Sequence, residues 1–174
     1  QGLSRPMAAP ALALRDITCR FPSPDGQGTY TAVADTTLVI EAGQFVSVVG
    51  PTGCGKSTLL NAAAGLLAPS AGKVEVFGEP MAFDGRVNRR AGYMFQADAL
   101  MPWRRVIDNA ALGLEVQGVP RRQARERVAP LFRQFGLAGF ENNYPSQLSG
   151  GMRQRLALLR TVVANNSPAS GVDT

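Results

Sequence analysis

Apolar and polar residues alternate through the first part of the chain, a pattern typical of β-strands with one buried face. The alternation runs from Leu12 to Phe21 and resumes from Tyr30 to Ile40. Residues 22–28, between the two segments, are rich in Pro, Gly and Ser, which favour turns. We therefore expect the two strands to form an antiparallel hairpin.

A short, largely apolar run follows at Phe45–Val49, bounded by Gly43 and Gly50. Short runs of this kind are typical of strands that are buried on both faces in a parallel sheet. The next segment, Lys56–Leu67, has leucines and alanines at helical spacing and is predicted to be a helix. Further short strands are predicted at Val74–Phe77 and Tyr93–Phe95.

After Gln96 the pattern becomes helical, and we predict helices roughly over residues 104–114, 121–135 and 149–164. Pro130 lacks an amide proton and clashes with the preceding turn, so it should kink or split the second helix. Strands with intervening helices indicate an α/β protein, in which the helical block forms an inserted lobe.

The segment between the apolar run and the first helix carries the motif G-x-x-x-x-G-K-[ST] at Gly50–Ser57. Its glycines allow backbone amides to wrap around a phosphate, because side chains would obstruct the approach. The following helix adds partial positive charge at its N-terminus. Lys56 supplies a charge for the outer phosphates, and the Ser57 hydroxyl can ligate Mg²⁺. The segment therefore predicts a phosphate-binding loop, or P-loop.

The composition narrows the chemistry that this chain can perform. Its 174 residues, 45% of them hydrophobic, are typical of one globular domain, and they include no His and only 2 Cys. These counts exclude His-based triads, His metal sites, a disulfide framework and a zinc quartet. No apolar run approaches the roughly 20 residues of a membrane-spanning helix and no secretory signal is visible, so we expect a soluble, cytosolic protein.

The formal net charge of +5 comes from arginine more than lysine, because the only lysines are Lys56 and Lys73. The arginines are densest over residues 121–127. A solvated helix face explains such a run. A surface for nucleic acid or anionic lipid is the alternative, but no recognition motif accompanies it, and we predict no nucleic-acid partner.

A second motif, Leu148–Met152, has the sequence L-S-G-G-M. By itself it describes a helix capped by Ser149, with two glycines that let a ligand approach the exposed amides. Together with the P-loop, it resembles the signature L-S-G-G-[Q/M] of the ATP-binding subunits of ABC transporters. The resemblance spans residues 12–164, nearly the whole chain.

The resemblance implies roles for further residues. Gln96 falls where the family has a glutamine that contacts Mg²⁺ and the attacking water. Phe21 falls where the family has an aromatic residue that stacks on adenine, although core packing is the alternative for Phe21 and Tyr30 is a competing candidate. Residues 97–118, which include Trp103, resemble importers of the nitrate, sulfonate and taurine group, where this segment lies near the permease. Trp103 is alternatively an interior anchor of the helical lobe.

The resemblance further implies an ATPase in which two copies enclose two ATP molecules head to tail. Lys56 and Gln96 are expected to act in catalysis, and Ser57 and Gln96 to bind Mg²⁺. The residues expected to bind nucleotide are Phe21, Gly50, Pro51, Thr52, Gly53, Cys54, Gly55, Lys56, Ser57, Thr58, Ser149, Gly150 and Gly151. The expected cofactors are ATP and Mg²⁺. The expected partners are a second ATP-binding subunit, a membrane permease that holds the protein at the cytoplasmic face and, indirectly, a periplasmic or extracellular solute-binding protein.

The implied organisation is a single ATP-binding domain. Residues 11–96 are expected to form the β subdomain and P-loop core, 97–148 the helical subdomain, and 149–165 the signature helix. The remaining residues, 1–10 and 166–174, are expected to be tails.

The chain departs from the family near its C-terminus. The family has an apolar Walker B strand followed by an Asp that holds Mg²⁺ through water and a Glu that polarises the attacking water. Counted from Leu148, this pair would fall near Val172–Asp173, but residues 167–174 contain no apolar run, and the chain has no His for the family's switch position. We therefore expect a domain truncated before Walker B, with the run at Phe45–Val49 exposed along one edge.

Two functions remain open at this point: an ATP-hydrolysing subunit that powers an importer, or a truncated fragment that binds nucleotide without hydrolysing it. A kinase or GTPase is a third interpretation. It is disfavoured because no guanine-specificity motif accompanies the P-loop and because it does not explain Leu148–Gly151. The transported solute is not encoded in this chain, because selectivity belongs to the permease and the binding protein.

Overall fold

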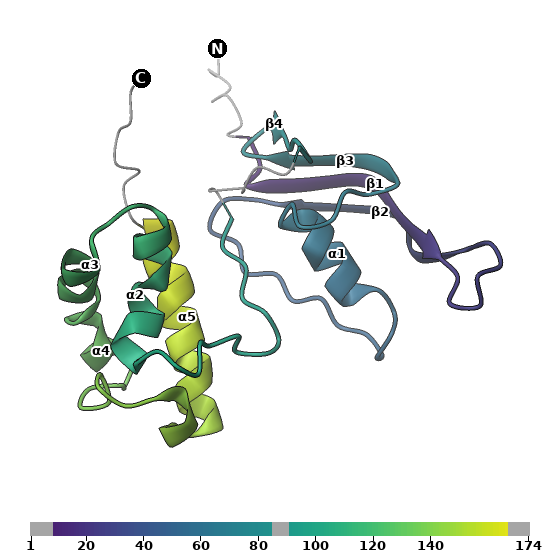
Figure 1. The fold of residues 1–174 in the computed structure, drawn as a ribbon. Helices are drawn as coiled ribbons and strands as arrows, with labels where there is room; N and C mark the ends of the chain where they lie inside the picture. Colours follow the sequence, from purple (N-terminus) through teal and green to yellow (C-terminus); the bar gives the residue numbers. More distant parts are fainter. Residues whose placement is uncertain (1–8, 85–90, 167–174) are drawn as a thin grey trace, which may run out of the picture. The chain divides into compact units, whose positions relative to one another are not determined.

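The computed structural model describes residues 9–84 and 91–166. The chain divides into two compact units, Gln1–Asn88 and Arg89–Thr174, each with its own hydrophobic core (Figure 1). Most residues of the two predicted tails, including Asp173, lie outside the described residues. The predicted change from strands to helices falls close to the division between the units.

The N-terminal unit is built on a four-stranded antiparallel sheet with the strand order β2–β1–β3–β4. Its strands are β1 (Leu12–Pro22), β2 (Thr29–Ile40), β3 (Ala71–Val76) and β4 (Glu79–Pro80). The predicted hairpin of the first two strands is confirmed. Because β1 is paired on both edges, Leu14 and Ile17, which lie on either side of a register shift in this strand, are buried at the centre of this unit.

One helix, α1 (Lys56–Ala63), packs against this sheet and covers the first part of the helix predicted at residues 56–67. The helix contributes Leu59 and Ala62 to the core of the N-terminal unit. The sheet contributes the other buried members of this core, Leu14, Ile17, Cys19, Val33 and Val74. The core therefore fixes where the start of α1 lies relative to β1 and β2.

The strands predicted at residues 45–49 and 93–95 are wrong, because neither segment is a strand in the structure. A strand buried in a parallel sheet needs parallel neighbours, but every strand pair in the described part of the chain is antiparallel. The exposure expected for the first segment is confirmed, since Phe45 and Val49 are 96% and 87% exposed. Its apolar sequence suits a buried strand, but the described residues provide no neighbour for it.

The second unit is helical and consists of α2 (Val106–Val116), α3 (Arg121–Val128), α4 (Leu131–Gln134) and α5 (Gly150–Asn166), with a short 3₁₀ turn at Pro145–Gln147. The predicted split at Pro130 is confirmed, because this residue separates α3 from α4. The helix α2 packs against both α3 and α5. The buried core consists of Val106, Ala110, Ala111, Leu114, Ala124, Val128, Phe132, Leu137, Leu148, Leu156, Leu159 and Val163.

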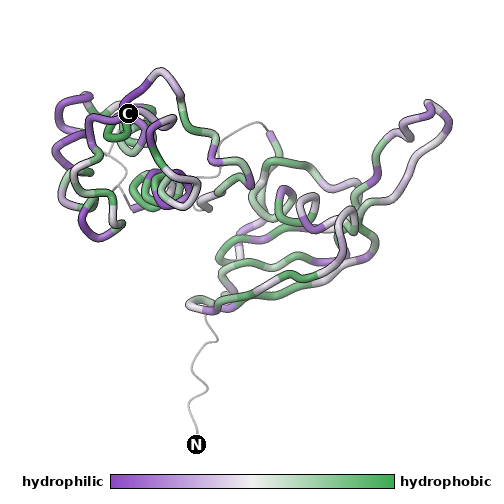
Figure 2. Tube along the Cα trace, turned by 90° about the horizontal axis from the view of Figure 1, so that it is seen from below, coloured by the Kyte–Doolittle hydropathy of each residue, from purple (hydrophilic) through white to green (hydrophobic). Residues whose placement is uncertain are grey.

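The hydropathy of the helices fits this packing. At the left of Figure 2, α3 is mostly hydrophilic and buries only Ala124 and Val128. The more apolar α2 lies between α3 and α5 and buries residues on several sides. Within the described ranges, none of the helices combines the length and apolar character needed to cross a membrane.

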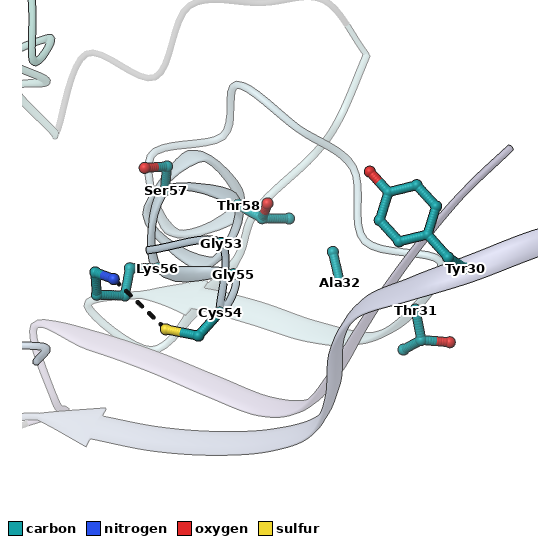
Figure 3. A pocket seen from close by; sticks show the side chains of 9 residues that line it. All are labelled: Tyr30, Thr31, Ala32, Gly53, Cys54, Gly55, Lys56, Ser57 and Thr58. Atoms are coloured by element: carbon teal, nitrogen blue, oxygen red, sulfur yellow. Dashed lines mark hydrogen bonds between the residues drawn. The ribbon is translucent and has the colours of Figure 1, made fainter. Parts of the chain in front are cut away.

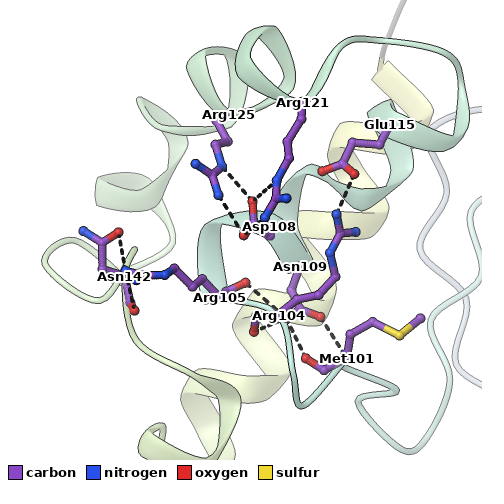
Figure 4. A network of polar contacts seen from close by, with 9 residues as sticks. All are labelled: Met101, Arg104, Arg105, Asp108, Asn109, Glu115, Arg121, Arg125 and Asn142. Carbon is purple, nitrogen blue, oxygen red and sulfur yellow. Dashed lines mark hydrogen bonds and ion pairs between the residues drawn. The ribbon is translucent and has the colours of Figure 1, made fainter.

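A buried carboxylate joins α2 to α3. Asp108 lies in the first turn of α2, and its side chain is only 2% exposed. Arg121 and Arg125, one turn apart on α3, each donate two hydrogen bonds to its oxygens at 2.7 to 3.1 Å (Figure 4). The side chains of the predicted solvated arginine face remain accessible, 56% for Arg121, 89% for Arg122 and 39% for Arg125. Arg121 and Arg125 in addition bind a buried carboxylate.

A neighbouring buried residue of α2, Asn109, holds the turn that precedes the helix. Its Oδ1 accepts a hydrogen bond from the Met101 amide at 2.7 Å, and its Nδ2 donates to the carbonyls of Met101, Arg104 and Arg105 (Figure 4). This turn carries Trp103, which is 73% exposed. The alternative that Trp103 is an interior anchor is therefore wrong.

The carboxylate of Asp108 makes the stability of the helical unit depend on pH. Burial by itself raises the pKa of Asp108, but the hydrogen bonds and charges of Arg125 and Arg121 outweigh burial and hold this pKa well below its ordinary value. A lowered native pKa stabilises the fold above the unfolded-state pKa of about 4. This stabilisation declines as the pH falls through that value toward the native pKa.

We expect Asp108→Asn to lower the free energy of unfolding of the helical unit by about 2 kcal/mol at neutral pH, because both arginines lose their charged partner. Hydration of the partly exposed arginines keeps the loss below that of a fully buried pair. Urea denaturation from about pH 7 to about pH 3 should show the gap between the two proteins shrinking in acid. The exposed control Glu126→Gln should stay within about 0.5 kcal/mol at every pH. A gap for Asp108→Asn that does not change with pH would contradict this role.

Candidate functional site

The P-loop lies against strand β2 at a point where no side chain fits. Gly55, the residue that precedes α1, has the left-handed φ of 91°. A Cβ at this position would collide with the carbonyl oxygen of Ala32 and press on a methyl group of Val33. Gly53 has a similar φ of 84°, but open space surrounds the position of its Cβ. Glycine is therefore required at Gly55 both by conformation and by contact.

The start of α1 presents unpaired amides. The first helical hydrogen bond runs from the Leu59 amide to the Gly55 carbonyl at 2.9 Å. The amides of residues 55–58 precede this bond and so have no partner within the helix. No side chain caps the terminus, and no acidic residue lies in its first turn. Four amides and the positive end of the helix dipole therefore suit an anion.

Lys56 is folded back onto the P-loop. Its Nζ donates hydrogen bonds to the carbonyls of Gly50 at 2.8 Å and Pro51 at 2.6 Å. It donates a third to the Cys54 Sγ at 3.5 Å (Figure 3). An ammonium group has three protons, and sulfur is only a weak acceptor. Two strong bonds therefore fix the ammonium over the loop, and the third proton, which is donated only to sulfur, can turn to a stronger acceptor such as a phosphate oxygen.

A pocket of about 420 Å³ adjoins these groups (Figure 3). Residues from β2, the P-loop and α1 line it: Tyr30, Thr31, Ala32, Gly53, Cys54, Gly55, Lys56, Ser57 and Thr58. The lining contains one cation and no carboxylate, and it includes the hydroxyl-bearing residues Ser57 and Thr58. This site can therefore bind an anion through main-chain amides, a lysine and hydroxyls.

The signature motif lies at the start of α5 in the helical unit. The Oγ of Ser149 accepts a hydrogen bond from the Met152 amide at 3.3 Å, so the predicted capping by Ser149 is confirmed. Gly150 and Gly151 form the first exposed turn of the helix. A second helix N-terminus with small residues is therefore open to solvent.

The structure also shows a link that the sequence patterns did not reveal. Arg153 of α5 donates to the carboxylate of Asp98 at 2.9 Å and to the Leu148 carbonyl at 2.8 Å. Two turns further along α5, Arg160 donates hydrogen bonds to the carbonyls of Ala99 and Asp98 at 2.8 and 2.9 Å. Gln96, which is exposed, precedes this segment by two residues. The chain that follows Gln96 is thus attached to the helix that carries the signature motif.

The predicted site residues are divided between the two units. Phe21 and the whole P-loop belong to the N-terminal unit, whereas Gln96 and Ser149–Gly151 belong to the helical unit. Within the N-terminal unit, Tyr30 lines the pocket beside the P-loop. Phe21 packs against the core, with its ring centroid 5.7 Å from that of Tyr30.

A loop that offers amides and a lysine to an anion at the start of a helix places the chain among the P-loop nucleotide-binding proteins. Its sequence matches the ABC transporter family over residues 33–168, so the chain belongs to that family. The expected α/β class, with an antiparallel β unit and a helical unit, is confirmed by this membership and by the fold of solved relatives.

Two curated relatives and one solved protein illustrate the similarity. The chain is 43% identical to a taurine import ATP-binding protein, TauB of Burkholderia pseudomallei (strain 1710b), over 81% of this chain and 53% of that protein. It is 44% identical to a sulfate/thiosulfate import ATP-binding protein, CysA of Gloeobacter violaceus, over 78% of this chain and 39% of that protein. The chain thus spans about half the length, or less, of these relatives.

The solved protein is the bacterial ABC transporter cassette MJ0796. Its dimeric structure superposes with a TM-score of 0.77 at 30% identity, over 89% of this chain and 70% of that chain. A second structure of the same cassette, in a post-hydrolysis state bound to ADP and Pi, superposes with a TM-score of 0.76 and also has 30% identity. The fold of this chain is therefore that of an ATP-binding cassette.

The contact of Gly55 with β2 predicts that alanine lowers the free energy of unfolding more at Gly55 than at Gly53. Gly53→Ala should cost about 1–2 kcal/mol, because it adds only left-handed strain. Gly55→Ala should cost at least about 1 kcal/mol more, because its Cβ also meets the Ala32 carbonyl and must push the loop off the strand. Urea denaturation of both variants and the parent chain measures these losses. Equal losses would show that the backbone contact does not constrain the loop.

Proposed function

We propose that the chain is the nucleotide-binding part of a subunit that powers an ABC importer by binding and hydrolysing ATP. The observation that carries this proposal is the P-loop itself, where unpaired amides, Lys56 and a carboxylate-free pocket converge at the start of α1. The proposal is supported by the family to which the chain belongs and by relatives named as import ATP-binding proteins.

In this proposal the amides of residues 53–58 hold the phosphates of ATP. The remaining Lys56 proton binds an outer phosphate oxygen, so the lysine bridges the loop carbonyls and the ligand. Charge-assisted hydrogen bonds of this kind are about twice as strong as neutral ones. Residues 50–52 position the lysine through the carbonyls of Gly50 and Pro51, and Thr52 continues the loop toward Gly53.

Ser57 is the residue proposed to hold Mg²⁺ in the N-terminal unit. The described residues contain no group of three or more Cys, Asp or Glu side chains that could hold a metal ion by themselves. A hydroxyl at the start of α1, beside the phosphate-binding amides, fits Mg²⁺ that is shared with phosphate oxygens. When bound, the ion neutralises phosphate charge. Gln96 is proposed to join this site from the helical unit as a second Mg²⁺ ligand and to orient the attacking water.

The signature motif is proposed to act on the nucleotide of a second copy of the subunit. The open N-terminus of α5 at Ser149–Gly151 suits the γ-phosphate for the same reason that α1 suits the phosphates of its own nucleotide. Two copies would then enclose two ATP molecules head to tail. The pairing of two copies is supported by the dimeric structure of MJ0796.

The remaining partners proposed are a membrane permease, which holds the subunit at the cytoplasmic face of the membrane, and indirectly a solute-binding protein. ATP-driven dimer closure would drive the permease, and hydrolysis would reset it. Relatives named for taurine and for sulfate or thiosulfate import are 43% and 44% identical to the chain. Sequence identity therefore does not separate these solutes.

The two lysines of the chain allow a matched test of the P-loop. Lys56→Ala should weaken ATP binding by roughly 10- to 100-fold, because a charged donor to the phosphates is lost. Lys73→Ala removes the same charge from an exposed position of β3 outside the pocket and should leave the affinity unchanged. Titration with a fluorescent ATP analogue in the presence of Mg²⁺ measures both. Equal affinity of Lys56→Ala and the parent chain would refute the proposed site.

A further inference from the structure

The segment that carries Gln96 begins at a close contact with α5. Gly92 lies against the side chains of Thr161 and Asn165, and a Cβ at this position would collide with both. Thr161 is tied to its own helix, because its hydroxyl donates a hydrogen bond to the Ala157 carbonyl at 3.0 Å. The absence of a side chain at Gly92 therefore lets the backbone approach α5 four residues before Gln96.

The same segment is attached to α5 again two residues after Gln96. The guanidinium of Arg160 donates one hydrogen bond to each of the carbonyls of Ala99 and Asp98. Arginine can hold two acceptors at once because its N–H groups form a rigid fork. Burial lowers the pKa of Arg160, as expected for a guanidinium that has lost part of its water. Arg153 adds an ion pair with the carboxylate of Asp98.

The second attachment includes a residue in an unfavourable conformation. Ala99 has a φ of 48°, in the left-handed region that a residue with a Cβ rarely adopts. Such a conformation persists only where its surroundings impose it. The hydrogen bond from Arg160 to the Ala99 carbonyl acts directly on this turn. Loss of Arg160 should therefore release the turn and the end of the segment nearest to Gln96.

Between the two attachments, the position of Gln96 depends on the backbone. Its side chain is exposed and has no hydrogen-bond partner among the described residues. The preceding part of the segment is ordered locally, since the rings of Tyr93 and Phe95 meet edge to face with centroids 4.8 Å apart. The amide of Gln96 is therefore presented by a segment that α5 holds on both sides.

We propose that Arg160 is a positioning residue for Gln96, which it keeps in place for Mg²⁺ by holding the backbone of Asp98 and Ala99 on α5. The inference rests on the proposed function, which gives Gln96 its role, and it adds a residue of α5 to that site. A ligating group on a fixed backbone loses less conformational entropy when it binds. Without Arg160, this entropy is lost on binding, so affinity falls only when Mg²⁺ accompanies ATP.

The test is a double-mutant cycle on ATP affinity, measured by calorimetric titration of the chain with Mg²⁺ and, separately, with EDTA. Gln96→Ala should weaken Mg²⁺-ATP binding by roughly 5- to 20-fold, and Arg160→Gln by roughly 3- to 10-fold. Neither variant should change ATP binding in EDTA by more than about 2-fold, since the P-loop is unchanged. The double variant should bind Mg²⁺-ATP like Gln96→Ala alone, because Arg160 acts through Gln96.

Two further variants separate positioning from a general effect on the fold. Gly92→Ala pushes the segment off α5 at its other end without removing a charge, and it should show the same Mg²⁺-dependent loss. It also replaces Arg160→Gln if that variant does not fold, as judged by circular dichroism. Arg155→Gln is the matched control, because Arg155 is an exposed arginine of α5 that makes no hydrogen bond to residues 92–99 among the described contacts. It should bind ATP like the parent chain in both conditions.

The inference is overturned if Gln96→Ala leaves Mg²⁺-ATP binding unchanged, or if Arg160→Gln and Gly92→Ala leave it unchanged or weaken ATP binding equally in EDTA. It is also overturned if the losses of Gln96→Ala and Arg160→Gln add in the double variant, the result expected of a residue that only stabilises the helical unit. The proposed function fails separately, if the folded parent chain binds ATP in neither condition. Lys56-dependent binding in EDTA supports that function whatever Arg160 does.

Discussion

The proposed nucleotide site depends on one backbone contact, that of Gly55 with the carbonyl of Ala32 in β2. The contact is possible only without a side chain, and it fixes the end of the P-loop on the edge of the sheet. The core fixes the helix that follows, because Leu59 and Ala62 pack among the strands. The amides at the start of α1 are therefore presented by a strand and a helix, which hold their positions more precisely than a free loop would.

The helical unit is organised by buried polar groups. Asp108 joins α2 to α3, and Asn109 ties the preceding turn to α2. Arg153 and Arg160 attach the segment at Asp98 to α5. For the proposed importer subunit, we expect the chain just after Gln96 to move together with the helix that carries the signature motif, because these hydrogen bonds join them. A displacement of either element is then transmitted to the other through defined hydrogen bonds.

Local patterns in the sequence predicted much of this fold. The alternation in residues 12–21 and 30–40 predicted the hairpin, Pro130 predicted the break between two helices, and the glycine-rich motif predicted the P-loop before α1. The failures share one cause, which is dependence on distant partners. Phe45–Val49 has the sequence of a buried strand, but strand formation requires a neighbour that local sequence does not supply.

The burial of Asp108 was not predicted from the sequence for a related reason. A polar residue in a helical pattern predicts exposure, and only the tertiary structure shows that arginines from another helix meet Asp108. The residues expected to bind phosphate lie within one short segment, so a local sequence motif can specify them, and most of them line one pocket in the structure.

Hydrogen exchange of the chain with and without Mg²⁺-ATP tests most directly whether the P-loop is the phosphate site. The amides of residues 55–58 have no partner within α1, so bound phosphates should give them one and slow their exchange. Peptides that cover the P-loop and the start of α1 should therefore become protected in the N-terminal unit. Saturating ATP that leaves these peptides unprotected, while other segments of the chain become protected, would contradict the assignment of the site.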